Sequence, residues 1–262
     1  MPSLGLGTKT TNSGLITPGI VTDNLVLKHN YNAGSVVPVS NGAAYFDGTT
    51  SNNSITTTLA GDTAFKDTDF SMSAWIKRLS NSQYQKVFYA TDAGTDRVEL
   101  YFKNDPAEAS LILVIAPKVG TTAAAYCHAL TDWNGNYDGI WTHVAATYTA
   151  GAAKIYINGV DDTDTTTTNT STIDIDLSAT VSIGERFYGN ICNAGLWTRV
   201  LTPAEIKSVM WKQYADLTTS EKTSITAWWN LDSEVGSDGN AGSGYVLDEN
   251  AGAGSTTNLG TL

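Results

Sequence analysis

The sequence has few charged residues, and acidic residues dominate among them. Charged residues make up 16% of its 262 residues, with 15 Lys and Arg against 26 Asp and Glu, which gives a net charge of −11. Nucleic acids and anionic lipid surfaces are bound through clustered Lys and Arg. No apolar run approaches the ~20 residues that cross a bilayer as a helix. We therefore expect neither nucleic acid nor a membrane as a partner.

Cysteine is also scarce, and no leader segment is visible. Two cysteines, Cys127 and Cys192, cannot form a disulfide framework or a zinc site. They could pair if facing strands bring them together, but two buried thiols suit a chain without a secretory signal. Residues 1–7 carry neither the basic region nor the apolar core of such a signal. We therefore expect the protein to fold in the cytosol.

Neutral polar residues take the place of charge, and they indicate a large all-β domain. Thr, Ser and Asn are abundant and there are 24 Gly, which is typical of β-branched strands joined by Gly- and Asn-rich turns. Segment 70–78 alternates in polarity, and Asn158-Gly159 predicts a tight turn between strands. The clearest helix signal begins at Thr202, which precedes Pro203 and an acidic first turn. At least ten short strands and one late helix predict an antiparallel sandwich.

The same patterns predict the domain organisation. Residues 1–24 are rich in Gly, Thr, Ser and Pro without periodicity, which predicts an extended N-terminal arm. No linker divides the rest, so we expect residues 25–262 to form a single β-sandwich that includes a C-terminal strand and a Gly-rich tail. Within that strand Trp228 and Trp229 are consecutive, so they point to opposite faces.

Several motifs follow one another in a recognisable order. They are AYFDG at 44–48, FSMSAWIK at 70–77, WTHVAATY at 141–148 with KIYING at 154–159, SIG at 182–184 with the segment 188–197, and LTPAEI at 201–206. This order resembles the laminin-G-like domains of the concanavalin-A-like lectin/glucanase superfamily. The resemblance implies a jelly roll of two curved antiparallel sheets. More loosely, the arm and residues 27–42 are similar to laminin-G-like proteins encoded by marine tailed phages.

The same superfamily contains glycoside hydrolases, so a catalytic site has to be considered. A family glucanase strand carries Glu-x-Asp-x-Glu, whose outer carboxylates act as nucleophile and acid. The nearest match here runs from Thr172 to Asp176 and has a threonine at the nucleophile position. The double displacement cannot run without that carboxylate. We therefore expect no catalytic residues and disfavour a hydrolase.

One loop has the oxygen-rich spacing of a calcium site. Carboxylate and amide side chains alternate in it, at Asp132, Asn134, Asn136 and Asp138. It departs from the EF-hand pattern, because Tyr137 stands where Gly is needed and His143 where Glu is needed. A polar turn explains the loop about as well, so Ca²⁺ is a candidate cofactor that is not required. The resemblance adds three alternative ligands, namely Asp47, Asp62 and Asp248.

The same loop carries the best sequence candidate for sugar binding. Sugars stack their apolar faces on aromatic rings, while amide groups bond to their hydroxyls. Trp133 and Tyr137 would supply the rings, and Asn134 and Asn136 would supply the amides. The alternative is that a lone loop tryptophan packs locally or in an interface.

Two functions remain open from the sequence. The first is a non-catalytic virion structural protein, a phage capsid decoration or appendage subunit that forms a homo-oligomer and has other capsid subunits as partners. The Gly-rich arm, the phage-like N-terminus and the missing leader favour it, with assembly in the host cytoplasm and a final location in the virion. The alternative is an extracellular carbohydrate-binding adhesion module that recognises host-surface glycans.

Overall fold

The part of the chain that the structure describes begins at residue 40. The computed structural model describes residues 40, 42–48, 54–60, 64–65, 69–79, 84–91, 97–103, 110–116, 125–133, 136–149, 152–169, 180–232, 245–246, 249–250 and 260–261. All of them belong to one unit that spans residues 34–262. The predicted arm, residues 1–24, lies outside the described residues and stays a prediction. No described helix is long and apolar enough to cross a membrane.

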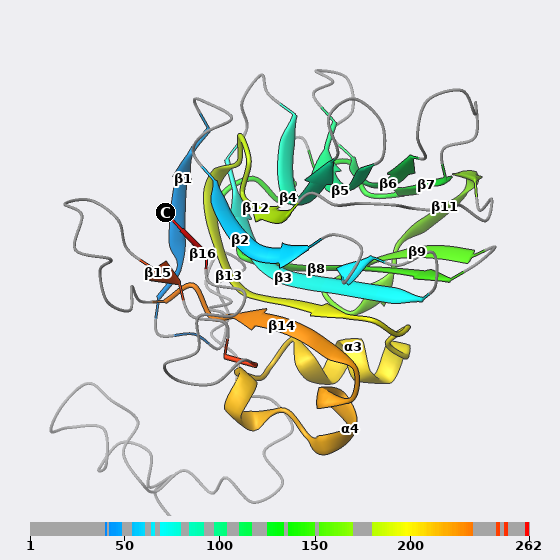
Figure 1. The fold of residues 1–262 in the computed structure, drawn as a ribbon. Coiled ribbons are helices and arrows are strands. Elements are labelled where there is room, and N and C mark those ends of the chain that lie inside the picture. The colour runs from blue at the N-terminus through cyan, green and yellow to red at the C-terminus, as the bar shows by residue number, and fades with distance from the viewer. Residues whose placement is uncertain are drawn as a thin grey trace, which may run out of the picture. The chain divides into compact units, whose positions relative to one another are not determined.

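Two antiparallel sheets face each other (Figure 1). The first sheet has seven strands. One of them, β14 (Ile225–Trp229), pairs with the part of β13 that lies beyond the residues paired with β1. Its other strands follow in the order β1 (Ala44–Asp47), β13 (Tyr188–Trp197), β3 (Phe70–Arg78), β8 (Thr142–Thr149), β9 (Ala152–Ile157) and β10 (Val160–Asp161).

The second sheet contains the strands that position the candidate site. Its order begins with β11 (Thr163–Asn169), β7 (Ala125–Ala129), β6 (Leu111–Ala116), β5 (Arg97–Phe102), β4 (Gln85–Thr91), β12 (Thr180–Ile183) and β2 (Ile55–Ala60). Two short strands, β16 (Gly260–Thr261) and β15 (Tyr245–Val246), extend it to nine. The predicted fold class, a two-sheet antiparallel jelly-roll sandwich, is confirmed.

Strand alternation places the main core between the two sheets. In β3 the side chains of Phe70, Met72, Ala74 and Ile76 all enter this core, as the alternation of segment 70–78 predicts. In β5 the core receives Val98, Leu100 and Phe102. The residues between them, Arg97, Glu99 and Tyr101, therefore lie on the outer face of the nine-stranded sheet.

The outer face of the seven-stranded sheet is covered by a helical segment. It consists of α3 (Pro203–Val209), a 3₁₀ turn η1 (Tyr214–Asp216) and α4 (Thr219–Lys222). A second buried cluster joins this segment to the sheet, and Trp228 belongs to it while Trp229 belongs to the main core. The two consecutive tryptophans thus point to opposite faces as predicted. The predicted helix start is confirmed as well, because Thr202 caps α3 through a capping box with Glu205.

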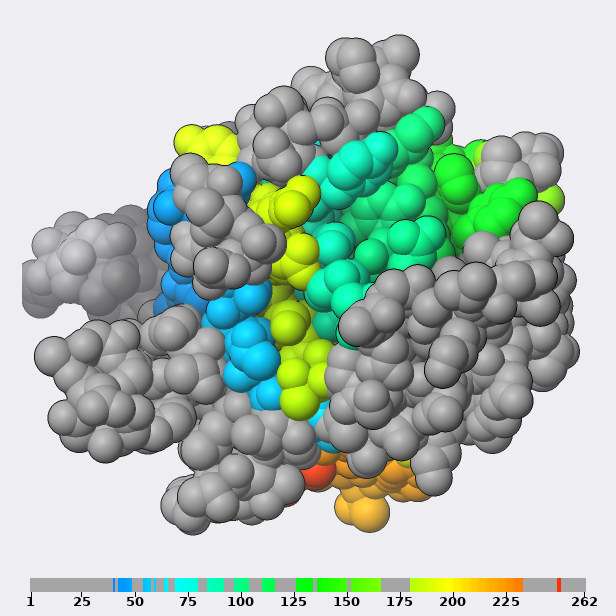
Figure 2. Space-filling model, turned by 45° about the horizontal axis from the view of Figure 1, so that its top comes forward, coloured from blue at the N-terminus to red at the C-terminus, as the bar shows by residue number. Residues whose placement is uncertain are grey.

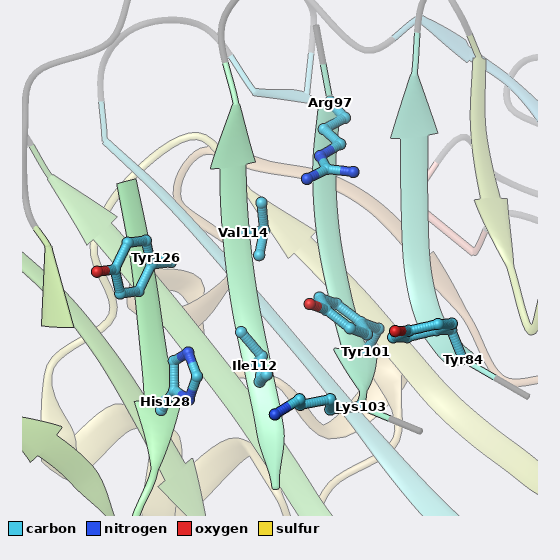
Figure 3. A pocket seen from close by; sticks show the side chains of 8 residues that line it. All are labelled: Tyr84, Arg97, Tyr101, Lys103, Ile112, Val114, Tyr126 and His128. Atoms are coloured by element: carbon cyan, nitrogen blue, oxygen red, sulfur yellow. The ribbon is translucent and has the colours of Figure 1, made fainter. Parts of the chain in front are cut away.

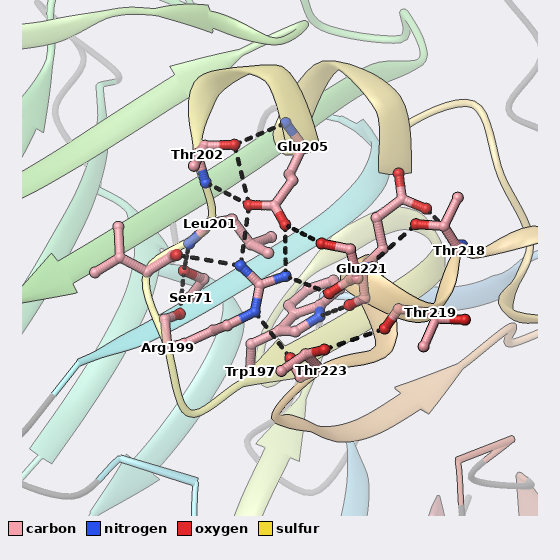
Figure 4. Close-up of polar contacts among 12 residues, drawn as sticks. Ser71, Trp197, Arg199, Leu201, Thr202, Glu205, Thr218, Thr219, Glu221 and Thr223 are labelled. Atoms are coloured by element: carbon pink, nitrogen blue, oxygen red, sulfur yellow. Dashed lines mark hydrogen bonds and ion pairs between the residues drawn. The ribbon is translucent and has the colours of Figure 1, made fainter.

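Arg199 ties α3 and α4 to the sheet (Figure 4). Its guanidinium donates to both carboxylate oxygens of Glu205, at 2.9 and 2.7 Å, and to the carbonyls of Ser220 and Thr223, at 2.9 and 2.8 Å. The hydrogen bonds from Arg199 are the largest cause that lowers the pKa of Glu205 to about 2. The indole Nε1 of Trp197 donates to the Glu221 carbonyl at 2.7 Å. This face of the sandwich is therefore closed by packing and by charge-assisted hydrogen bonds.

Both cysteines are buried thiols. Cys127 lies in β7 and Cys192 in β13, and neither forms a disulfide. Burial raises the pKa of the Cys192 thiol to about 12. The prediction of two buried thiols is confirmed.

Candidate functional site

The loop that the sequence singles out for sugar binding does not expose its tryptophan. Trp133 is fully buried in the main core, with ring centroids 4.6 Å from Phe102 and 5.0 Å from Tyr137. Asn136 is exposed, but its amide donates to the Asp132 carbonyl at 3.0 Å and so closes the loop. Asn134 lies outside the described residues. The expectation that Trp133 and Tyr137 form an exposed stacking surface is wrong, because the loop folds its rings inward to close one end of the core.

The calcium interpretation of the same loop does not fit either. The carboxylate of Asp138 receives a hydrogen bond from the buried guanidinium of Arg78, with Nη1 and Oδ1 2.5 Å apart. Arg78 also lies over the ring of Phe102, 4.8 Å from its centroid. Burial lowers the pKa of Arg78 and raises that of Asp138, while their mutual attraction opposes both shifts. A guanidinium at this position repels a second cation, so the set Asp132, Asn136 and Asp138 is a poor calcium site.

Only one of the three alternative calcium ligands belongs to the described residues. Asp47 is exposed on β1, while Asp62 and Asp248 lie outside the described residues. Among the described residues, no three His, Cys, Asp or Glu side chains converge on a point. Calcium binding by Asp47, Asp62 or Asp248 stays a prediction.

The outer face of β4–β7 gathers aromatic side chains that the sequence does not single out. Register aligns its residues in rows across the strands. Tyr101 of β5 pairs with Ile112 of β6, which pairs with His128 of β7. In the next row Val114 pairs with Tyr126. Neighbouring strands are ~4.8 Å apart, so a row over three strands spans ~10 Å.

These rows enclose a pocket of about 290 Å³. The buried side chains of Ile112 and Val114 form its floor, and Tyr126 and Tyr84 stand at its two sides, 37% and 47% exposed (Figure 3). Tyr84 lies 6.0 Å from Tyr101 between ring centroids. The described lining residues are Tyr84, Arg97, Tyr101, Lys103, Ile112, Val114, Tyr126 and His128. Figure 2 looks on to this face, where the sheet runs from blue β2 through yellow β12 to green β7.

A second hollow of about 460 Å³ adjoins the pocket over β4 and β5. Its centre is Lys86, whose ammonium lies 2.9 Å from Glu185, 3.7 Å from Glu99 and 3.5 Å from the ring centroid of Tyr89. Tyr84, Arg97 and Tyr101 line both hollows. The two therefore form one continuous surface that contains rings, an apolar floor and nitrogen donors.

A family model matches this architecture. Residues 41–207 match Laminin_G_3, which is described as the concanavalin A-like lectin/glucanases superfamily. The chain belongs to this superfamily. A search of curated proteins found no match.

Solved structures share the concanavalin A-like fold at low sequence identity. Domain 4 of the extracellular arabinanase AbnA from Geobacillus stearothermophilus, in complex with arabinotriose, is 21% identical over 64% of this chain and 76% of that one, with a TM-score of 0.50. A candidate carbohydrate-binding protein from Bacteroides ovatus is 18% identical over 84% and 57%, with a TM-score of 0.53. The enzymatically active domain of tailspike protein 2 of bacteriophage CBA120 is 11% identical over 79% and 36%, with a TM-score of 0.47. This chain thus spans less than two thirds of the length of the last two proteins.

The arrangement on this concanavalin A-like domain suits binding better than catalysis. Tyrosine rings offer flat apolar faces and a hydroxyl at the rim, and the floor of Ile112 and Val114 favours an apolar ligand face. The two carboxylates of the second hollow, Glu99 and Glu185, are both held by Lys86. The hydrolase-like motif Thr172–Asp176 lies outside the described residues.

The alternation of β5 and β7 could have indicated this site. Arg97, Glu99 and Tyr101 are polar or aromatic on one face of a strand whose other face is apolar, and Tyr126 and His128 repeat this in β7. The buried position of Ile112 and Val114 under that face could not be read from sequence, because a continuous apolar strand does not say which side chains form a pocket floor.

Proposed function

We propose that the domain is a carbohydrate-binding module whose binding surface is the outer face of β4–β7. The observation that carries this proposal is the pocket in which exposed Tyr84 and Tyr126 flank a floor of Ile112 and Val114. The helical segment with α3 and α4 packs against the other sheet. Two structures of similar fold, the arabinanase domain with arabinotriose and the candidate carbohydrate-binding protein, support it.

The physical basis is a preorganised platform. The rings are held by a sheet whose strands pair throughout, so little side-chain and loop ordering opposes binding. Tyr101 is half-buried, and burial is the largest cause that raises the pKa of its hydroxyl. That hydroxyl therefore remains a neutral donor and acceptor for a sugar hydroxyl.

A glycan array followed by calorimetry tests the proposal. The array is probed with the full chain, and each hit is titrated against wild type, Tyr101→Ala and Tyr126→Ala. Loss of one stacking ring should weaken binding about 3- to 10-fold. Tyr45→Ala is the matched control, because Tyr45 is 59% exposed on β1 of the other sheet. An array without hits, or equal losses in Tyr45→Ala and Tyr126→Ala, would refute the proposal.

The module is proposed to be non-catalytic. The pairing of Glu99 and Glu185 with the same Lys86 supports this. Wild type incubated with each array hit should release no new reducing ends over a day. Release that disappears in Glu99→Gln would show instead that the second hollow is a hydrolytic site.

The setting of the module is a separate proposal that rests on the sequence. We infer a subunit of a phage virion, in a capsid decoration or an appendage, assembled as a homo-oligomer with other capsid subunits. The Gly- and Thr-rich residues 1–24 and the phage-like N-terminus support it. Light scattering should find an oligomer, and the chain should co-sediment with purified particles. A clean monomer that does not sediment with particles would favour the free extracellular module.

A further inference from the structure

The binding pocket carries positive charge in a protein that is strongly acidic. The chain has a net charge of −11, yet the described residues that line the pocket include Arg97 and Lys103 and no Asp or Glu. Arg97 is the first residue of β5 and Lys103 follows its last residue, so the two cations lie on either side of Tyr101 (Figure 3). Figure 3 shows the guanidinium of Arg97 at one end of the pocket and the ammonium of Lys103 at the other. A ring that rests near Tyr101 would lie between two cationic groups.

The two described carboxylates that line the second hollow together with Arg97 are paired with another cation. Glu99 lies on the same face of β5, but it lines the second hollow, where it and Glu185 share Lys86. Among the described residues, no carboxylate lies within 4.0 Å of the Arg97 guanidinium. Burial and then the charge of Glu99 raise the pKa of the Tyr101 hydroxyl, and the charge of Arg97 opposes both. The pocket therefore presents a guanidinium whose planar donors suit an oxyanion.

We propose that the pocket binds an acidic sugar, one that carries a carboxylate or a sulfate ester. The anionic group would bond to Arg97, with Lys103 as a second cation, while the sugar ring packs on Tyr101 and the floor of Ile112. This inference rests on the proposed carbohydrate binding and adds the class of ligand. A sugar carboxylate and a sugar sulfate ester share one feature, an oxyanion on a pyranose or furanose ring. Two pairs of probes distinguish these two sources of the oxyanion.

Charge-matched probe pairs test the inference by calorimetry. The first pair is an oligogalacturonate and its methyl ester, in which a methyl group on each carboxyl removes the negative charge. The second is a sulfated galactan oligosaccharide and its desulfated form. We expect the charged member of at least one pair to bind about tenfold more tightly than its neutral partner. Raising NaCl from 50 to 500 mM should reduce that preference, because surface electrostatics are screened.

Variants connect the preference to the pocket. Arg97→Gln should abolish the difference in affinity between the charged and neutral members of a pair. Lys154→Gln is the matched control, because it removes the same charge from an exposed side chain of β9 on the other sheet. It should keep the full preference. Urea denaturation of each variant confirms that the fold is retained.

The outcomes separate the inference from the proposed function. Equal affinity for charged and neutral members, or a preference that survives in Arg97→Gln, overturns the acidic-sugar inference and leaves carbohydrate binding standing. If neutral glycans bind and both charged probes fail to bind, the acidic-sugar inference is likewise overturned and carbohydrate binding stands. No binding of any glycan, on the array or in calorimetry, overturns the proposed function itself.

Discussion

His143 should make the stability of this protein fall as the solution becomes mildly acidic. Its ring is 1% exposed on β8, edge-on to Trp75 at 5.6 Å between centroids. Trp75 donates its indole N–H to the Met210 carbonyl at 2.6 Å, which places both rings beneath the end of α3. Nδ1 of His143 has no hydrogen-bond partner among the described residues. Burial alone lowers the pKa of His143 from 6.5 to about 3.

The size and sign of the effect follow from proton linkage. In the unfolded chain His143 takes up a proton near pH 6.5, whereas in the folded protein it stays neutral until about pH 3. Between these values the unfolded state binds the extra proton, so the free energy of unfolding falls as pH falls, by about 1.4 kcal/mol per pH unit. From pH 6.5 to 4.5 the loss is ~2 kcal/mol, because at pH 6.5 the unfolded-state histidine is only half protonated. This window lies above the range in which Glu205, with its lowered pKa, adds its own loss.

Urea denaturation at pH 7.5, 6.5, 5.5 and 4.5 measures the effect. Wild type should lose ~2 kcal/mol between pH 6.5 and 4.5, whereas His143→Leu should lose much less because it has no group to protonate at this position. Thr142→Val is the control, since Thr142 is the buried neighbour of His143 and does not titrate. It should be less stable than wild type at every pH but keep the same slope. An unchanged slope in His143→Leu would refute the reasoning.

Three further predictions concern the helical segment and the loop. Arg199→Ala removes the hydrogen bonds to Glu205 and should lower the free energy of unfolding, measured in urea, by about 1–2 kcal/mol. The difference between this variant and wild type should shrink as pH falls from about 4.5 towards 2, where Glu205 protonates. Trp133→Ala should cost about 3–5 kcal/mol, since a buried ring leaves a cavity, and a loss below about 0.5 kcal/mol would mean that the ring is exposed. Asp138→Asn leaves the Arg78 guanidinium without its counter-charge and should cost about 2–3 kcal/mol in thermal denaturation. A rise in Tm when Ca²⁺ is added to chelator-treated wild type, lost in Asp138→Asn, would contradict this role.

Much of the fold could be predicted because strand alternation and turn residues are local signals. Segment 70–78 shows its core face directly, and Thr202-Pro203 marks the start of α3. The motifs at 44–48 and 182–184 could be recognised from the sequence. The physical reason that both are present is a long-range contact between them. Gly184 has a φ of +80°, and a Cβ there would lie 2.2 Å from Cε1 of Phe46. The two motifs therefore occur together because the ring of Phe46 packs on the backbone of Gly184.

The candidate site could not be predicted from any single segment. It is made by register, which brings Tyr101, Ile112 and His128 from three strands into one row. Trp133 shows the converse error, because a loop position next to polar residues suggests exposure. The chain direction after β7 instead turns the ring on to Phe102. Whether a loop ring faces solvent depends on packing that has no local signature.

The crystal structure of the protein with an array-selected glycan tests the central claim most directly. We expect sugar density on the outer face of β4–β7, with a ring in contact with Tyr101 or Tyr126 and an acidic group at Arg97. Density at the 132–139 loop or on the helical segment, with the β4–β7 face empty, would contradict it.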